Sequence, residues 1–316
     1  MTATPNPTSD PGTSPSYDIL VAGGAGVDTI VRVPALEVPS GDSVFVPPVY
    51  DYVAHTGNGV ARGARALGMA TKFVDFLGDD IQGRTILDAY AADGLDFSHV
   101  VSPHGTPRGV NLVDPQGRRF SFYDGRHPAD LRLPRDFYLP FLERARHVHL
   151  SITGVTKDMF DDVHRLGVPS STDLHDWDGE NEHHLAYALA ADYVFLSAAA
   201  IHDRLDDVLH TILDRGRARL VVATDGAAGC HVLERGDDKA RHFAAVRPPR
   251  PVVDSNGAGD AFVSAFLYAL AQGRPVEECV LAGSVSGAFA CTSAGTHTEF
   301  IDAAGLRAGC AAATAG

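Results

Sequence analysis

The chain alternates between two kinds of hydrophobic pattern. From Tyr17 onward, short apolar runs rich in β-branched residues are followed by longer segments in which apolar residues recur at helical spacing. A first buried strand is predicted at residues 17–24, and helices at residues 59–68 and 81–93 flank a strand at residues 72–78. After Leu139, strands and helices follow one another regularly. This order is typical of an α/β fold with a mostly parallel sheet and helices on its faces.

Two segments interrupt this alternation. Residues 28–53 combine period-two alternation with several prolines and have no helical period, which predicts a pair of strands where a helix would otherwise follow. Residues 109–125 form two alternating runs around the turn sequence Asp-Pro-Gln-Gly, which predicts a β-hairpin. We expect the two segments to join as one small sheet.

Composition and charge exclude several classes of protein. Hydrophobic residues make up 45% of the 316 residues and charged residues 21%, which is ordinary for a folded chain. The net charge of −14 disfavours nucleic acid and anionic membrane surfaces as partners. The longest apolar stretch, residues 261–271, is far shorter than the roughly 20 residues that a membrane-spanning helix needs. Neither a nucleic-acid partner nor a membrane span is therefore expected.

The ends of the chain and its cysteines indicate a compartment. Residues 1–16 are rich in Pro, Thr and Ser and have neither a basic start nor an apolar core, which predicts a disordered tail rather than a signal peptide. Residues 17–316 are then expected to form a single domain in the cytoplasm. No CxxC pair is present, which fits reduced thiols and argues against a structural zinc site. The cysteines are Cys230, Cys279, Cys291 and Cys310.

The segment with the strongest chemical signal follows residue 250. A strand-like Pro-Val-Val leads into the turn Gly257, Ala258, Gly259 and then into an apolar helix that ends near Gly273. The unpaired N–H groups at such a helix start, together with the helix dipole, make an anion site. Asp260, in the first turn, could take a proton from a hydroxyl that attacks a phosphoryl group. A favourable first-turn charge after a tight turn explains the spacing equally well.

Four motifs together resemble those of one enzyme family. Residues 254–266, DSNGAGDAFVSAF, are similar to the C-terminal signature of the ribokinase-like (PfkB) carbohydrate kinases, and residues 55–83 resemble the N-terminal signature. Residues 21–44 look like the first strand and the start of the β lid, and residues 224–229, TDGAAG, resemble the nucleotide segment. The resemblance implies a three-layer α/β sandwich with a small β-sheet lid, built here from about residues 29–53 and 97–124.

The resemblance also assigns roles to single residues. It implies Asp260 as the catalytic base, with Gly257, Ala258 and Gly259 as the anion hole for the transferred phosphoryl group. Asp28 would bind substrate hydroxyls, and Asp254 would contribute to a monovalent-cation site. The remaining positions are Gly57 and Asn58 for substrate, and Thr224, Gly226, Gly229 and Asn256 for the nucleotide. The implied cofactors are ATP and Mg²⁺, with K⁺ at the cation site, and the implied assembly is a homodimer through the lid.

The chain departs from the family pattern at two places. The position of a family Asn falls on Gly59, with Asn58 displaced by one residue and His55 as a second candidate to replace it. The family's Asn-x-x-Glu motif, which organises magnesium and phosphate, is replaced by Ser197 and Ala200. Loss of that Glu removes a charge that helps to hold the metal.

These observations favour an ATP-dependent sugar kinase that phosphorylates a hydroxymethyl group of a sugar or sugar-like substrate. Two alternatives stay open: a nucleoside kinase of the same family, and a catalytically impaired binding or regulatory protein on the same fold. A Rossmann dehydrogenase is disfavoured because Gly24, Ala25, Gly26 lacks the third glycine and leads into a strand. His147 and His149 alternate onto one strand face without further ligands nearby, so core histidines are the better interpretation.

Overall fold

A large twisted sheet forms the centre of the molecule. The computed structural model describes residues 16–37 and 41–315. The sheet is built from β1 (Ile19–Ala22), β4 (Thr71–Gly78), β5 (Asp96–Ser102), β8 (Val148–Leu150), β9 (Ser170–Asp173), β10 (Tyr193–Ser197), β11 (Leu220–Thr224), β12 (Cys230–Glu234) and β13 (Arg241–Phe243). Their order is β13-β12-β11-β10-β9-β8-β1-β4-β5. Strand β12 pairs in antiparallel fashion with both β11 and β13.

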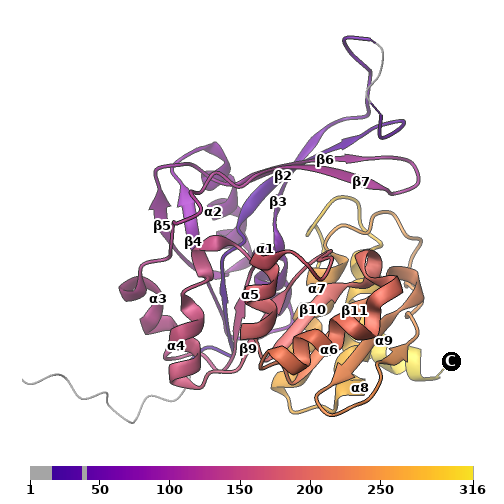
Figure 1. Ribbon diagram of the computed structural model, residues 1–316. Helices are drawn as coiled ribbons and strands as arrows, with labels where there is room; N and C mark the ends of the chain where they lie inside the picture. The colour runs from indigo at the N-terminus through magenta and orange to yellow at the C-terminus, as the bar shows by residue number, and fades with distance from the viewer. Residues whose placement is uncertain (1–15, 38–40, 316) are drawn as a thin grey trace, which may run out of the picture.

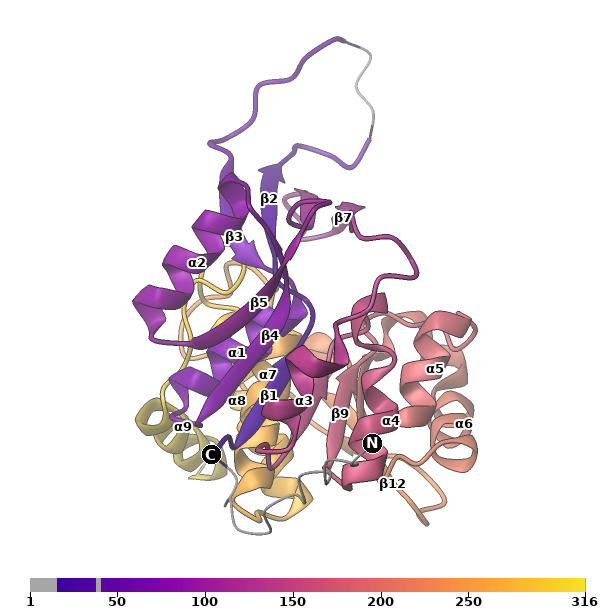
Figure 2. The same ribbon diagram turned by 90° about the vertical axis from the view of Figure 1, so that its left-hand side faces the viewer.

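Helices cover both faces of this sheet, which gives the three layers that the sequence predicts (Figures 1 and 2). One layer contains α1 (Thr56–Ala66), α2 (Ile81–Asp93), α7 (Ala258–Ala271), α8 (Val276–Ala290) and α9 (Ala303–Ala315). The other contains α3 (Arg135–Leu142), α4 (Met159–Leu166), α5 (Glu182–Ala190) and α6 (Leu205–Arg215). Ile19 and Val21 of β1 face one hydrophobic core, while Leu20 and Ala22 face the other. Successive side chains of a strand point to opposite faces, so the apolar run of β1 serves both cores.

A second, smaller sheet forms a lid. It consists of β2 (Gly26–Arg32), β3 (Tyr50–Ala54), β6 (Arg108–Val113) and β7 (Arg119–Asp124), in the order β3-β2-β6-β7. Figure 1 shows this sheet projecting over the body on one side. The hairpin and the joining of the two predicted segments are confirmed by the pairing of β6 with both β7 and β2.

Two boundaries differ from the sequence prediction. Residues 96–102 are not part of the lid: they form β5, which pairs in parallel with β4 at the edge of the large sheet. The second lid segment therefore begins at Arg108. Residues 251–253 are not a strand, because they are exposed and their backbone contact is a hydrogen bond from Val253 N–H to the Cys291 carbonyl rather than to a strand.

The remaining expectations fall partly outside the described residues. The predicted tail covers residues 1–16, of which only Ser16 is described; its backbone N–H donates to the Arg144 carbonyl. The four cysteines are free thiols, with Cys230 and Cys279 buried. Within the described part of the chain, no helix combines the length and the apolar character that crossing a membrane requires.

Candidate active site

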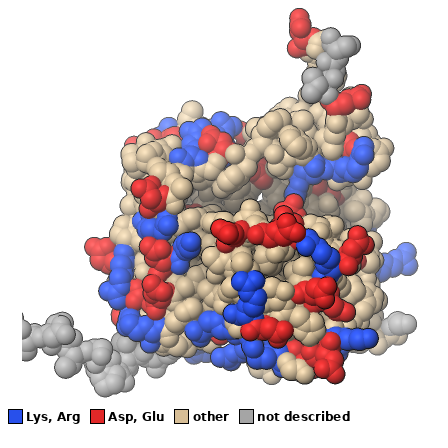
Figure 3. Space-filling view, viewed as in Figure 1, with Lys and Arg blue, Asp and Glu red and all other residues tan. Residues whose placement is uncertain are grey.

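A cavity of about 1020 Å³ lies between the lid and the body. Its walls include Asp28 and Tyr123 from the lid and Gly257, Asp260 and His297 from the body. The space-filling view shows a hollow between the two parts, with acidic side chains gathered along its lower edge (Figure 3). The glycine-rich turn and the predicted substrate aspartate, which are more than two hundred residues apart in the sequence, therefore face one space.

The turn before α7 is built as an anion cradle. Gly257 caps the helix with a φ of 78°, a left-handed conformation that glycine adopts without strain. Ala258, Gly259 and Asp260 form the first helical turn, so their backbone N–H groups have no partner within the helix. Asp260 is 8% exposed and lines the cavity. These four residues thus lie together at the start of the long, largely buried helix α7.

Asp28 faces the same cavity from β2. Its Oδ1 lies 3.2 Å from His55 Nε2. Burial raises the pKa of Asp28, but contacts with His55 and Asn111 lower it more, so the net shift is downward. A Cβ atom on Gly109 would come within 2.3 Å of Asp28 Oδ1, so only glycine leaves the carboxylate its place. Asp28 is therefore an ionised carboxylate that can accept hydrogen bonds from substrate hydroxyls.

Of the positions expected to contact the sugar at the start of α1, His55 lines the cavity, whereas Gly57 and Asn58 do not. A Cβ on Gly57 would lie 1.8 Å from the Gly23 carbonyl oxygen, so Gly57 serves close packing between α1 and the end of β1. The Asn58 amide nitrogen contacts the Val53 carbonyl oxygen at 3.1 Å and His297 Nδ1 at 2.9 Å. The expectation that Asn58 contacts substrate is replaced by a contact with His297.

His297 is the main site residue that sequence reasoning missed. Its Nε2 lies 2.8 Å from Asp260 Oδ2. A Cβ on Gly59 would come within 2.3 Å of His297 Nε2 and 2.6 Å of the Asp260 Cβ. The absence of a side chain at residue 59, where the family carries Asn, therefore makes room for the imidazole. That departure was the only signal in the sequence that pointed to it.

The predicted nucleotide residues lie apart from the large cavity. Thr224 ends β11 and pairs in register with Ser197 at the end of β10, so the two neighbouring strand ends meet there. Gly226 and Gly229 shape the turn that follows, with φ values of 51° and 105°. Asn256 accepts a hydrogen bond from Arg119 of the lid, at 2.7 Å.

The side-chain oxygens of Asp254 are paired with donors of this chain and are not free to bind a potassium ion. Its Oδ2 pairs with Arg32 Nη2 at 2.7 Å and also accepts from the Gly295 N–H at 3.3 Å. Its Oδ1 accepts from the Asn256 N–H at 3.1 Å. The side chain is 4% exposed, so both oxygens are already occupied by donors in a nearly closed place. The guanidinium supplies the positive charge that the sequence interpretation assigned to K⁺.

Two further buried carboxylates belong to the site. Burial raises the pKa of Asp75 to about 7, although hydrogen bonds from the N–H groups of Ala25 and Phe76 oppose the shift. Burial also raises the pKa of Asp173 at the end of β9, where His175 opposes the shift and the charge of Asp260 adds to it. No group of three or more His, Cys, Asp or Glu side chains in residues 16–37 and 41–315 is arranged to hold a metal ion by itself.

Comparisons with known proteins agree with this fold. The model of the pfkB family carbohydrate kinases matches residues 184–303. The acarbose 7(IV)-phosphotransferase of Actinoplanes sp. is 48% identical over 290 residues, which cover 92% of this chain and 97% of that protein. Fructoselysine 6-kinase of Escherichia coli is 28% identical over 223 residues, 70% of this chain and 82% of that one. The structure of a microbiome-derived acarbose kinase superposes with a TM-score of 0.87 at 46% identity, covering 94% of this chain and 99% of that chain.

A Gly-rich helix start beside an aspartate, under a β lid on a three-layer sandwich, defines a phosphotransferase for alcohol acceptors. The chain belongs to the pfkB family of carbohydrate kinases, and it is an ATP-dependent sugar kinase.

Proposed function

We propose that this kinase phosphorylates a large sugar, and that acarbose or a related oligosaccharide is its acceptor. The cavity between lid and body carries the proposal: about 1020 Å³ is at the upper end of the range for small-molecule sites and exceeds the needs of one monosaccharide. The lid adds Phe120 and Phe122 to the walls, whose apolar faces suit stacking against sugar rings. The 48% identity to the acarbose phosphotransferase supports the same substrate class.

Asp260 is the general base in this proposal. A substrate hydroxyl gives its proton to the Asp260 carboxylate while its oxygen bonds to the γ-phosphorus of ATP. The bond from that phosphorus to the bridging oxygen breaks, and ADP leaves with the electron pair. The N–H groups of residues 257–259 stabilise the negative charge on the transferred group. Asp28 accepts hydrogen bonds from other hydroxyls and so orients the sugar.

Magnesium on the nucleotide completes the proposal. Mg²⁺ neutralises phosphate charge and is usually bound through one or two carboxylates and several waters. With Ser197 and Ala200 in place of the family's Asn-x-x-Glu motif, Asp173 is the carboxylate that fits this role. It is buried, its pKa is raised by that burial, and a Cβ on Gly259 in the cradle would lie 3.9 Å from its Oδ2. A nearby cation would relieve the cost of its burial.

Two expectations from the sequence remain part of the proposal. A homodimer through the lid is supported by β7, an edge strand of the lid sheet whose outer backbone N–H and C=O groups are available to pair with a second copy. A reducing compartment such as the cytoplasm is supported by the four free cysteines.

The experiment that tests the function compares two first-turn aspartates. ADP release is measured with acarbose, simple sugars and nucleosides as acceptors, for the wild type, Asp260→Asn and Asp207→Asn. Asp207 lies exposed in the first turn of α6, so its replacement removes the same helix-dipole interaction without touching the cavity. Asp260→Asn should lower kcat by about two to four orders of magnitude and leave the Kd of an ATP analogue nearly unchanged.

Asp207→Asn should keep wild-type kcat within about a factor of two, because an exposed first-turn charge affects only stability, by about 0.3–1 kcal/mol. Equal behaviour of the two variants would reduce Asp260 to a helix-capping charge. Turnover of nucleosides but not of oligosaccharides would favour the nucleoside kinase, and ligand binding without any turnover would favour a regulatory protein.

A further inference from the structure

A chain of three polar side chains leads from α1 to the proposed base. The Asn58 amide nitrogen lies 3.1 Å from the Val53 carbonyl oxygen, which can only accept a hydrogen bond. This contact fixes the orientation of the amide, since its oxygen would be repelled there. The same nitrogen lies 2.9 Å from His297 Nδ1, and because it donates, Nδ1 must accept and carries no proton.

The tautomer of His297 follows from this contact. With Nδ1 unprotonated, the ring proton is on Nε2, which lies 2.8 Å from Asp260 Oδ2. A neutral imidazole therefore donates one hydrogen bond to the Asp260 carboxylate. That bond occupies Oδ2 and leaves Oδ1 available for a substrate hydroxyl, so the geometry separates the anchored oxygen of the carboxylate from its reactive one.

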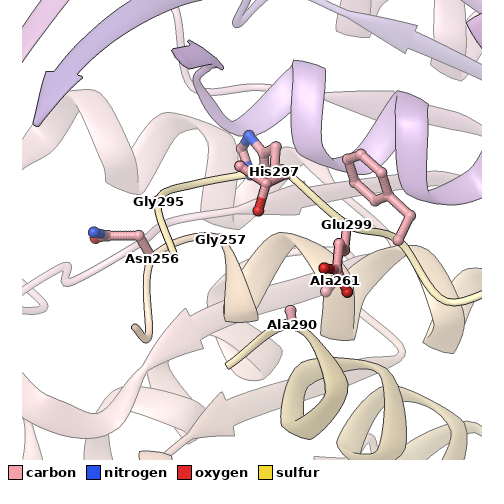
Figure 4. Close-up of a pocket in the computed structure, with 9 residues that line it drawn as sticks. Asn256, Gly257, Ala261, Ala290, Gly295, His297 and Glu299 are labelled. Carbon is pink, nitrogen blue, oxygen red and sulfur yellow. The ribbon is translucent and has the colours of Figure 1, made fainter. Parts of the chain in front are cut away.

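The rest of the molecule holds His297 tightly. Its backbone has a φ of 54°, a left-handed conformation that is strained for a histidine and that neighbouring structure must enforce. Its carbonyl accepts a hydrogen bond from Arg62 of α1 at 3.2 Å, and its ring stacks on Phe300 with centroids 6.2 Å apart. Figure 4 shows the loop of Gly295 and His297 crossing above Gly257 at the start of α7. The cavity that these residues line measures only about 10 Å³.

Two glycines leave the space that the His297 ring occupies. A Cβ on Gly59 would come within 2.3 Å of His297 Nε2, and a Cβ on Gly257 within 2.7 Å of His297 Cδ2. Gly59 lies inside helix α1, where glycine is less favourable than alanine because it loses more backbone freedom on folding. A glycine at this unfavourable helical position, a strained backbone at His297 and a fully paired imidazole all serve the same contact with Asp260.

We propose that His297 is a positioning residue for the phosphoryl-transfer step, and that Asn58 imposes its Nε2–H tautomer. The inference rests on the proposed role of Asp260 as the base. His297 holds the carboxylate in one rotamer with one oxygen directed at the acceptor hydroxyl, as a base must be within hydrogen-bond reach of the proton it abstracts. His297 acts on the reaction through the Asp260 carboxylate.

The kinetic test uses a replacement that keeps the donor and one that removes it. In His297→Gln the amide nitrogen can still donate to Asp260, whereas His297→Leu offers no donor. We expect His297→Leu to lower kcat by about 10- to 100-fold, with the KM for sugar and the Kd for an ATP analogue changed less than about threefold. His297→Gln should recover most of kcat. The control for loss of a structural histidine is His164→Gln. His164 belongs to α4, and its ring is hydrogen-bonded to the Ala190 carbonyl of α5.

A second measurement does not depend on activity. Two-bond nitrogen–proton NMR correlations of ¹⁵N-histidine-labelled enzyme report the tautomer of each ring, and the resonances of His297 are those missing in His297→Gln. The neutral Nε2–H form supports the proposal. The Nδ1–H form overturns it, and so does a His297→Leu variant that keeps more than half of the wild-type kcat. If Asp260→Asn stays active while the NMR shows Nε2–H, the proposed base is wrong although the contact is as described.

Discussion

At the scale of single residues, two histidines are buried in the core, where their charged form is strongly disfavoured. His149 lies on β8 and His147 directly precedes that strand, and both rings contact the Ser171 hydroxyl, at 3.0 Å and 2.8 Å respectively. Burial lowers the pKa of His147 to about 4 and that of His149 to about 3. The Nε2 atom of His149 has no hydrogen-bond partner among the described residues. Both rings are therefore neutral in the folded protein at neutral pH.

These histidines predict a loss of stability in mild acid. Their folded pKa lies below the unfolded value near 6.5, so between about pH 6.5 and 4 the unfolded chain binds protons that the folded chain does not. Stability should fall by about 1.5 kcal/mol per histidine between pH 6.5 and 5. Denaturant unfolding at both pH values should show a smaller loss for His149→Leu than for the wild type. The control is His104→Gln, at an exposed position, which should lose as much stability between the two pH values as the wild type. An equal loss in His149→Leu would show that His149 does not cause the pH dependence.

Single site residues could be predicted where they belong to a motif of residues that are adjacent in the sequence. Asp260 and its glycines form one contiguous motif, and Asp28 follows the first strand, so both could be placed from the sequence. His297 lies 37 positions beyond Asp260 on an irregular loop, and its partner Asn58 belongs to another helix. Only the folded chain brings these three together, so a lone histidine in Gly-Thr-His-Thr gave no usable pattern. Asp254 shows the reverse case, since its motif was clear but its partner Arg32 was not.

At the scale of elements, α1 packs closely against its neighbours through three glycines. A Cβ on Gly57, Gly59 or Gly63 would come within 1.8, 2.3 or 2.5 Å of the Gly23 carbonyl oxygen, His297 Nε2 or Ser264 Oγ, respectively. The helix can therefore approach both the end of β1 and helix α7 closely. Helix propensity opposes these glycines, so close packing outweighs it here.

Because the glycines of α1 are closely packed, we expect Gly63→Ala to destabilise the protein. Alanine should stabilise a helix interior by about 1 kcal/mol, but here its Cβ meets the Ser264 Cβ at 2.8 Å, and such overpacking costs about 1–3 kcal/mol. We expect a lower urea midpoint at an unchanged m-value. Gly305→Ala in α9 is the matched control, because its nearest contacts are side-chain atoms at 3.1–3.2 Å. A higher urea midpoint for both variants would show that α1 can accommodate a Cβ atom at residue 63 without overpacking.

Elements were predictable where periodicity was strong and less so where it was short. Helix α2 begins and ends at the predicted residues, because its N-cap Asp80 and its left-handed Gly94 are encoded locally. Strand β5 was assigned to the wrong sheet, because a short alternating run looks the same in either sheet and only pairing decides. The apolar residues 251–253 resembled a strand for the same reason, yet no neighbouring strand is available to them.

At the scale of the whole molecule, two arginines connect the lid to the loop before α7. Arg32, at the end of β2, pairs with buried Asp254 at 2.7 Å. Arg119, at the start of β7, donates to Asn256 at 2.7 Å on the surface. Both partners directly precede the anion cradle, so the position of the lid and the shape of the phosphoryl site are linked. The two contacts differ in strength, because only Asp254 would be left as a buried, unpaired charge.

Replacing Arg32 should therefore loosen the lid and the cradle together. In Arg32→Met the side chain keeps an unbranched apolar stem but leaves the Asp254 carboxylate, 4% exposed, without its cation. We expect backbone amides of β2 and β6 to exchange hydrogen at least about tenfold faster and the KM values for sugar and ATP to rise together by about tenfold, since opening the lid releases both substrates. Arg119→Met loses one exposed hydrogen bond to a neutral side chain, and its exchange rates should stay within about threefold of the wild type. If Arg32→Met exchanges no faster than Arg119→Met, the lid is held by its strand pairing alone and the link to the cradle is wrong.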